Sequence, residues 1–206
     1  MKVKSKTAFR EPTKTANLNR WYRKRLLQIA KQVDLIAREF EEETDLFVAV
    51  SQIQRRLFSY EDSLNAYALD IASVMLKRAD QADYDTWLRV GEGITRATRK
   101  RLRSPAIANE YQRMQAEQVD LIKTIPHEAA MKVHEWVRSG LANGQRFPEI
   151  AARIKNELGA STEARAICIA RTETARARSN FTQARAKAVG STGYIWRTVG
   201  DGAVRD

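Results

Sequence analysis

Apolar residues near the start of the chain recur at alternating intervals of four and three. The pattern consists of Tyr22, Leu26, Ile29, Val33, Ile36 and Phe40. Because about 3.6 residues complete one helical turn, these side chains form a single stripe along a long helix over about 20–42. A stripe this regular requires a cover of other helices. The cover can come from this chain, around Ile53 and Ile71, or from another protein subunit, and the pattern leaves both alternatives open.

Comparable periodicities predict helices along almost the whole chain. A second helix is expected after Thr44 or Asp45, either of which can act as its N-cap. Pro126 occupies a position typical of the first turn of a helix, and Gly159 is typical of a helix C-terminus. A long helix rich in alanine and arginine is then expected over 162–189.

Only residues 194–199 alternate in the manner of a β-strand. The sequence therefore predicts a mainly α fold: an elongated multi-helix bundle with a short β segment at the C-terminal end. The expected organisation is a flexible basic arm over 1–16, an N-terminal helical region over 17–104 and a second region over 105–206.

Positive charge is concentrated near the N-terminus over 2–10, in the middle of the chain over 96–103, and near the C-terminus over 176–187. The chain has 36 Lys and Arg against 25 Asp and Glu, a formal net charge of +11, which favours an anionic partner such as nucleic acid. The candidate contact residues are Lys2, Lys4, Lys6, Arg10, Arg96, Arg99, Lys100, Arg101, Arg103, Arg176, Arg178, Arg185 and Lys187. These residues can neutralise phosphates or bind an acidic protein surface. A solubilising tail and solvated helix ends explain the same charges almost as well.

The sequence contains no recognisable set of catalytic or metal-binding residues. Cys168 is the single cysteine, so no internal disulfide can form, and its apolar neighbours predict a small core residue. His127 and His134 are seven residues apart, too far along a helix to hold one metal ion together. No apolar run approaches the length of about 18 residues that a membrane span requires. We therefore expect no enzyme activity, no cofactor, no metal and no membrane contact.

From Asp120 onward, several features follow one another in a characteristic order. A helix with an Ile-Pro pair precedes a glycine-containing turn, the segments EIAARIKNEL and ARAICIARTET, a glycine-rich break, and a tryptophan in a strand-like stretch followed by Asp. This part of the chain resembles the phage head morphogenesis family, the Mu F-like minor head proteins. The motif positions are Arg171, Thr172, Glu173, Trp196 and Asp201. Family members continue past the tryptophan strand, so the resemblance predicts that region 105–206 is incomplete at its C-terminus.

The resemblance implies a minor head (capsid) protein that acts in head morphogenesis. Such a protein would bind near the portal inside the capsid, contact packaged double-stranded DNA without sequence specificity, and pass through the host cytoplasm during assembly. It implies the portal protein as partner, with the major capsid protein or a scaffolding protein as further candidates. The alternative is a nucleic-acid-binding protein that reads no sequence and has no portal role.

The Arg-Thr-Glu motif is expected to be structural and to tie its helix to the neighbouring helices. Arg171 shares a stripe with Ile167, Cys168 and Ala175, which predicts partial burial of its side chain. A buried arginine needs an acceptor, and Glu173 lies on a different face of the same helix, so the acceptor must come from elsewhere in the protein.

Overall fold

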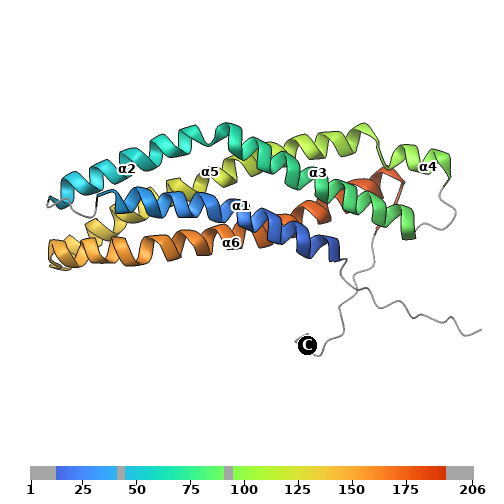
Figure 1. Cartoon of the computed structure of the whole chain (residues 1–206). Coiled ribbons are helices and arrows are strands. Elements are labelled where there is room, and N and C mark those ends of the chain that lie inside the picture. The colour runs from blue at the N-terminus through green and yellow to red at the C-terminus, as the bar shows by residue number, and fades with distance from the viewer. Residues whose placement is uncertain (1–12, 41–44, 91–94, 194–206) are drawn as a thin grey trace, which may run out of the picture.

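The computed structural model describes residues 13–40, 45–90 and 95–193. Within these ranges the chain forms six helices (Figure 1). They are α1 (Thr13–Arg38), α2 (Leu46–Ser63), α3 (Asn65–Val90), α4 (Arg96–Arg101), α5 (Pro105–Ala142) and α6 (Phe147–Ala188). The five long helices lie side by side in an elongated bundle, and the short α4 sits at one end of it.

The predicted elongated, mainly α bundle is confirmed, but the predicted fold class must be corrected in its β part. No strand occurs in the three described ranges. The expected strand over 194–199 lies outside them. A single strand-like segment has no second strand to pair with among the described residues, and isolated strands are not stable in water. The described fold is therefore entirely helical.

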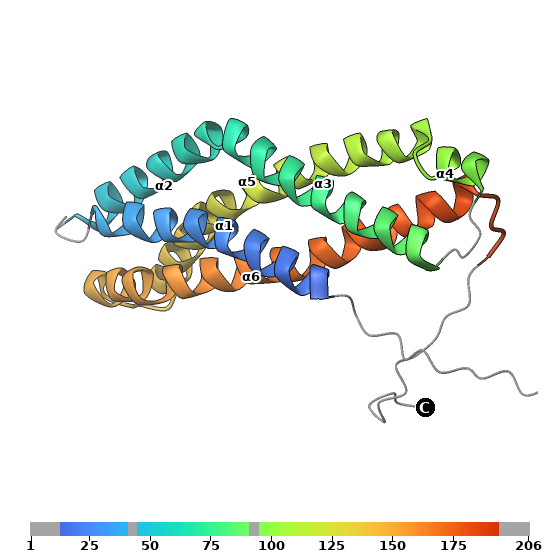
Figure 2. The ribbon, with the colours of Figure 1, turned by 45° about the vertical axis from the view of Figure 1, so that its right-hand side comes forward.

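Two ends of the bundle can be distinguished by following the chain (Figures 1 and 2). Helix α1 runs away from the end that carries α4, α2 and α3 return along the bundle, α5 runs out again, and α6 returns. We call the end with α4 and the last turns of α3 and α6 the α4 end. The opposite end, where α1 connects to α2 and α5 connects to α6, is called the hairpin end.

The apolar stripe of α1 is covered by helices of the same chain. Tyr22, Leu26 and Val33 are fully buried, and Ile29 and Ile36 are at most 3% exposed. Ile29 lies in the same core cluster as Ile71, whereas Val33 and Ile36 lie in a second cluster with Ile53. Of the two alternatives for covering this stripe, the structure supports the internal one.

The beginnings and ends of the helices agree only in part with the sequence-based expectations. Asp45 caps α2, because its Oδ1 accepts hydrogen bonds from the backbone N–H groups of Phe47 (2.9 Å) and Val48 (3.3 Å). The expected helix start at Pro126 is wrong, since this proline is buried in the middle of the continuous helix α5. The expected helix end at Gly159 is wrong as well, since α6 continues through it.

Gly140 and Gly159 lie inside helices because neighbouring side chains approach them closely. A Cβ atom at Gly140 would stand 2.7 Å from Cγ1 of Ile150, across the turn between α5 and α6. A Cβ atom at Gly159 would stand 2.6 Å from Oδ1 of Asp34 on α1. Both distances are shorter than normal contacts, so a side chain at either position would collide with its neighbour. Both glycines therefore allow close packing of helices, although glycine is also common at helix ends.

Alanine substitutions at these two glycines are expected to have different effects. Gly140→Ala should lower the free energy of unfolding by about 1–3 kcal/mol, because Ile150 is fully buried and cannot move aside. Gly159→Ala should change it by less than about 1 kcal/mol, because the Asp34 carboxylate can rotate away and alanine favours the helix. Urea unfolding followed by circular dichroism measures both values, and equal losses would contradict this interpretation of the contacts.

Candidate interaction surface at the α4 end

Helix α4 projects between α3 and α5 and is anchored at both of its ends. Thr95 caps it by accepting a hydrogen bond on Oγ1 from the backbone N–H of Thr98 (3.2 Å). Leu102, directly after the helix, is fully buried. Pro105 then starts α5, where a proline fits because the first helical turn needs no N–H donor at that position. The segment between the anchors is therefore held out toward solvent.

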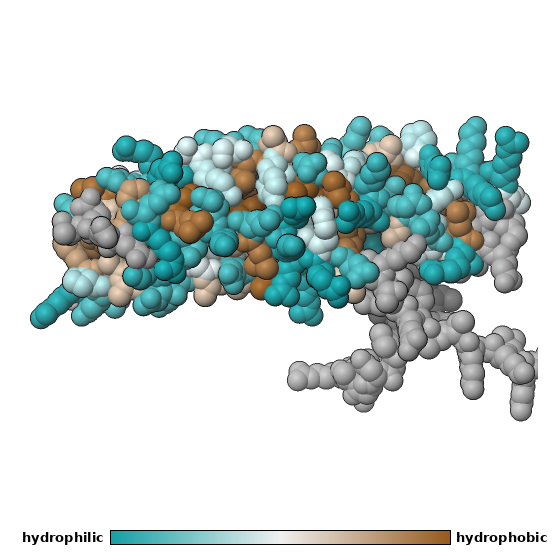
Figure 3. Space-filling view, viewed as in Figure 1, coloured by the Kyte–Doolittle hydropathy of each residue, from teal (hydrophilic) through white to brown (hydrophobic). Residues whose placement is uncertain are grey.

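Five basic side chains are exposed together on this segment. They are Arg96, Arg99, Lys100, Arg101 and Arg103. Among the described residues, none of the five forms an ion pair with a carboxylate, although Arg103 lies over the ring of Tyr84 at 4.4 Å. Figure 3 shows long hydrophilic side chains projecting at this end of the visible face. Unpaired positive charge of this density attracts anions.

Several arginines elsewhere on α5 and α6 have carboxylate partners. Arg113 pairs with Glu110 and Glu117, and Glu117 also pairs with Arg176 at 2.7 Å. The hydrogen bond and charge of Arg113 lower the pKa of Glu110 below its usual value. The charge of these cations is largely compensated within the protein, so the α4 segment is the stronger candidate for binding an external anion.

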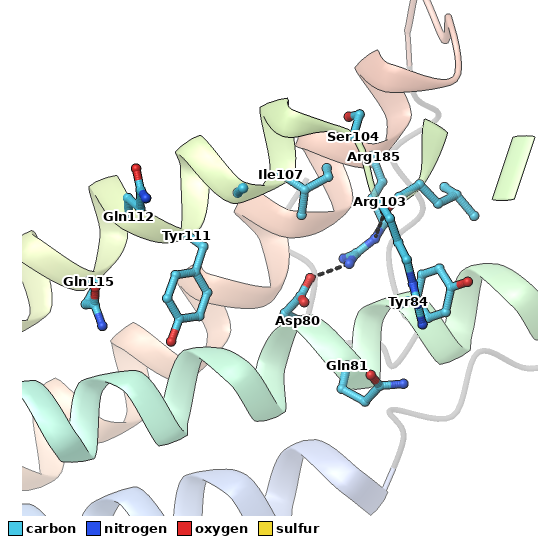
Figure 4. A pocket seen from close by; sticks show the side chains of 12 residues that line it. Asp80, Gln81, Tyr84, Arg103, Ser104, Ile107, Tyr111, Gln112, Gln115 and Arg185 are labelled. Atoms are coloured by element: carbon cyan, nitrogen blue, oxygen red, sulfur yellow. Dashed lines mark hydrogen bonds and ion pairs between the residues drawn. The ribbon is translucent and has the colours of Figure 1, made fainter. Parts of the chain in front are cut away.

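Arg185 of α6 is buried below α4 and connects three helices (Figure 4). Its side chain is 1% exposed, and its Nε donates a hydrogen bond to the carbonyl oxygen of Leu102 at 3.2 Å. Its Nη1 donates to Asp83 at 2.6 Å, and its Nη2 pairs with Asp80, both on α3. Thr182 also donates a hydrogen bond to Asp83. This arrangement, here called the Arg185 clamp, fixes the C-terminal end of α4 to α3 and α6.

A pocket of about 560 Å³ lies beside the Arg185 clamp, between α3, α5 and the residues after α4 (Figure 4). Two of its polar side chains have hydrogen-bond partners within the protein, whereas Oγ of Ser104 is buried without one among the described residues. Tyr111 donates a hydrogen bond to the carbonyl oxygen of Ser73 at 3.1 Å, and Gln115 donates to Oγ of Ser73 at 2.6 Å. The described lining residues include no histidine that could act as a base toward Ser104.

The structure places the predicted contact residues of α6 in different environments. Arg185 is inside the clamp, so its side chain is unavailable to an external partner in this fold. Arg176 is paired with Glu117, and Arg178 is half-buried and has a contact within the chain. Lys187 is exposed. The predicted contact residues of α6 therefore do not form one continuous exposed basic surface.

The predicted residues near the N-terminus, Lys2, Lys4, Lys6 and Arg10, lie outside the described residues. The same holds for the motif residues Trp196 and Asp201.

In the Arg-Thr-Glu motif the buried member is the glutamate. Arg171 and Thr172 are exposed, so the expected partial burial of Arg171 is wrong. Glu173 is 7% exposed and accepts a hydrogen bond from Nε2 of Gln118 at 2.5 Å. The Oε1 of Gln118 accepts in turn from the hydroxyl of Tyr22 at 2.9 Å. Glu173 thus connects α6 to α5 and α1.

Burial of Tyr22, reinforced by the charge of Glu173, raises the pKa of its phenol far above the ordinary value of 10.0. Burial also raises the pKa of Tyr60 to about 12, with a smaller contribution from Tyr67. Above pH 10 the unfolded chain loses these protons while the folded protein keeps them. Rising pH therefore favours the unfolded state.

We predict that the free energy of unfolding falls above pH 10, by up to about 1.4 kcal/mol per pH unit for each of the two tyrosines. Tyr22→Phe should make this fall shallower, because the substituted side chain has no proton to lose. Urea unfolding at pH 9, 10 and 11 measures the slope. An identical slope in the wild-type protein and the Tyr22→Phe variant would show that the Tyr22 phenol does not carry the effect.

Several important residues of this region were missed from the sequence. Asp80 and Asp83, the partners of Arg185, are about one hundred residues away from it in the chain. Their spacing places both carboxylates on the same side of α3 as the buried Leu76 and Ala79, which was the available signal. Cys168 is exposed, which contradicts its expected place in the core.

Membrane-spanning helices and metal-binding clusters are both absent from the described part of the chain. No helix among them is long and apolar enough to span a bilayer. No three His, Cys, Asp or Glu side chains of the described ranges come together as a possible metal site.

Comparisons with known proteins found similarity over most of the chain and a family match in its C-terminal part. An uncharacterized protein of Haemophilus influenzae is 29% identical over 201 residues, which cover 90% of this chain and 44% of that protein. The chain thus spans less than half the length of this relative. No solved structure matches the chain. Residues 131–206 match the family described as "Phage Mu protein F like protein", and they include all of α6 with its Arg-Thr-Glu motif. Over residues 131–206, the chain is therefore similar to the Mu F-like phage proteins.

Proposed function

We propose that this chain is a minor head protein of a tailed phage and that its α4 end contacts packaged DNA without reading the sequence. It acts as a structural component, not as an enzyme, in the host cytoplasm during assembly and afterwards in the virion, inside the capsid near the portal. The observation that carries the DNA contact is the group of five exposed cations on and after α4, none of which pairs with a described carboxylate. The similarity of residues 131–206 to the Mu F-like family supports the place in the head.

The proposed partners follow from the same two observations. The portal protein is the principal partner, and the major capsid or scaffolding protein is a further one. Region 105–206 carries the family features, and 17–104 supplies helices that complete the same cores, since α1 and α3 pack against α5 and α6. Residues 1–12, which precede α1, add positive charge to the chain.

Binding to a DNA duplex of random sequence tests the DNA contact. A triple variant, Arg99→Gln, Lys100→Gln and Arg101→Gln, should reduce the slope of log affinity against log salt concentration by about 3, because each phosphate contact contributes roughly one unit. A matched control replaces Arg55, Arg56 and Arg138 by Gln. These residues are also exposed but lie away from the α4 end, and their loss should change the slope by less than about one unit. Equal slopes for the two triple variants would remove the α4 end as the binding surface.

Retention by immobilised portal protein tests the second part of the proposal. We expect the wild-type chain to be retained at low and moderate salt after nuclease treatment, so that DNA cannot bridge the two proteins. Binding to DNA without binding to the portal protein would instead favour the alternative function, a sequence-independent nucleic-acid-binding protein with no portal role.

A further inference from the structure

Helices α1 and α6 lie side by side and run in opposite directions along the bundle (Figures 1 and 2). Nδ2 of Asn19 donates hydrogen bonds to the carbonyl oxygen of Ala170 at 3.0 Å and to Oγ1 of Thr174 at 3.1 Å. Further toward the hairpin end, Asp34 of α1 lies against Gly159 of α6. These contacts fix the level at which residues of α1 face residues of α6.

This register brings four exposed basic residues together, three from α1 and one from α6. Arg20 directly follows Asn19, and Arg23 lies one turn further along the same side of α1. Lys24 is next to Arg23, and Arg171 lies one residue past the carbonyl group that Asn19 contacts. We call the group of Arg20, Arg23, Lys24 and Arg171 the α1–α6 seam. It lies along the bundle and apart from α4, which projects between α3 and α5.

The positive charge of the α1–α6 seam is not compensated by carboxylates of the described ranges. None of its four cations forms an ion pair with a described carboxylate. Helix α1 has no acidic residue over 13–33. After Glu163, the only acidic residue of α6 is Glu173, which is buried and points to α5. Glu163 itself and Asp70 of α3 are exposed, and neither pairs with the seam.

The same segments lack the exposed apolar side chains that other anionic partners require. None of the exposed large hydrophobic residues lies within 16–33 of α1 or 160–188 of α6. A protein interface usually has aromatic or aliphatic residues at its centre, and a helix bound to a membrane surface inserts such residues into the lipid. The phosphates of a nucleic acid duplex need only cations. The chemistry of the α1–α6 seam therefore fits a nucleic acid backbone best.

We propose that the α1–α6 seam is a second DNA-binding surface, on which Arg20, Arg23 and Arg171 contact the backbone phosphates of a duplex. Arg20 and Arg23 are about 4.5 Å apart along the axis of α1. Arg171 faces them from α6, so the three guanidinium groups can reach neighbouring phosphates. The surface follows from the packing of α1 on α6 and does not depend on α4. Only the choice of DNA as the polyanion rests on the proposed function.

The salt dependence of binding to a duplex of random sequence, measured with the full chain, tests this proposal. The seam variant, Arg20→Gln, Arg23→Gln and Arg171→Gln, should reduce the slope of log affinity against log salt concentration by about 3 and weaken binding about tenfold or more. The control triple variant used for the α4 end removes the same charge and should change the slope by less than about one unit. All three seam residues are exposed, so the helical content should stay that of the wild type.

A charge-preserving variant separates charge from packing. Arg20→Lys, Arg23→Lys and Arg171→Lys should keep the wild-type slope to within about one unit, because each position still carries one positive charge. A loss of slope as large as that of the glutamine variant would contradict a phosphate contact that depends on charge.

The remaining outcomes distinguish the α1–α6 seam from the α4 end and DNA from other partners. A seam variant with the slope of the control would overturn the seam, whether or not the α4 variant has its expected effect. A reduced slope in the seam variant, with none in the α4 variant, would support the seam and remove the α4 contact. Phosphatidylserine vesicles and poly-glutamate serve as further probes at the same salt concentration. Binding of either probe as tight as that of the duplex, and lost in the seam variant, would overturn DNA as the partner.

Discussion

Replacing Arg185 by methionine is expected to lower the free energy of unfolding by about 3–5 kcal/mol, the largest effect of any single charge removal in this protein. The substitution leaves the Asp83 carboxylate, whose side chain is 3% exposed, without its guanidinium partner. It also removes the donor to the carbonyl oxygen of Leu102. An unpaired buried charge is costly because it has lost its water and gained no partner.

The control for this prediction is Arg176→Met on the same helix. The side chain of Arg176 is 44% exposed, so the loss of its ion pair with Glu117 should cost no more than about 1 kcal/mol. A double variant that also carries Asp83→Asn should recover part of the loss seen with Arg185→Met, because the buried negative charge is then gone. Urea unfolding measures all three variants. An effect of Arg185→Met as small as that of Arg176→Met would refute the clamp.

Replacing Ile29 by aspartate should leave the isolated protein unfolded. Ile29 is 1% exposed in the core that α1 shares with α3, α5 and α6, and a carboxylate there finds no partner. The combined loss of apolar burial and cost of buried charge approaches the whole stability of a typical domain, about 5–15 kcal/mol. Circular dichroism and limited proteolysis report the loss of structure.

Leu35→Asp on the same helix provides the matched control. Leu35 is 46% exposed, so this substitution introduces the same charge at the surface and should leave the fold intact. A soluble, folded Ile29→Asp protein would contradict the internal cover of the α1 stripe and point to cover by another subunit.

The fold could be predicted where the signal is local in the sequence. The α1 stripe follows from apolar periodicity, and the cap at Asp45 follows from a side chain that can reach nearby backbone N–H groups. Pro126 and Gly159 were misinterpreted because both residue types commonly mark helix ends. Here, tertiary packing decides instead: the ring of Pro126 is buried in the core, and Gly159 makes room for Asp34.

The positive charge of the α4 segment could be predicted from the sequence, but the carboxylate partners that remove Arg185 from the exposed cations could not. Adjacent cations such as Arg99, Lys100 and Arg101 are visible in the sequence, and a short helix ending at a buried leucine leaves them exposed. Arg185 has the same residue type and a similar helical spacing. What separates it from the others is Asp80 and Asp83, which only the packing of α3 on α6 brings near.

An asymmetric cryo-electron-microscopy reconstruction of phage heads assembled in the presence of this chain tests the proposed function most directly. We predict density for the elongated helical bundle next to the portal inside the capsid, with the α4 end directed toward the packaged DNA. Absence of the protein from purified heads, or a bundle whose α4 end faces away from the DNA, would contradict the account.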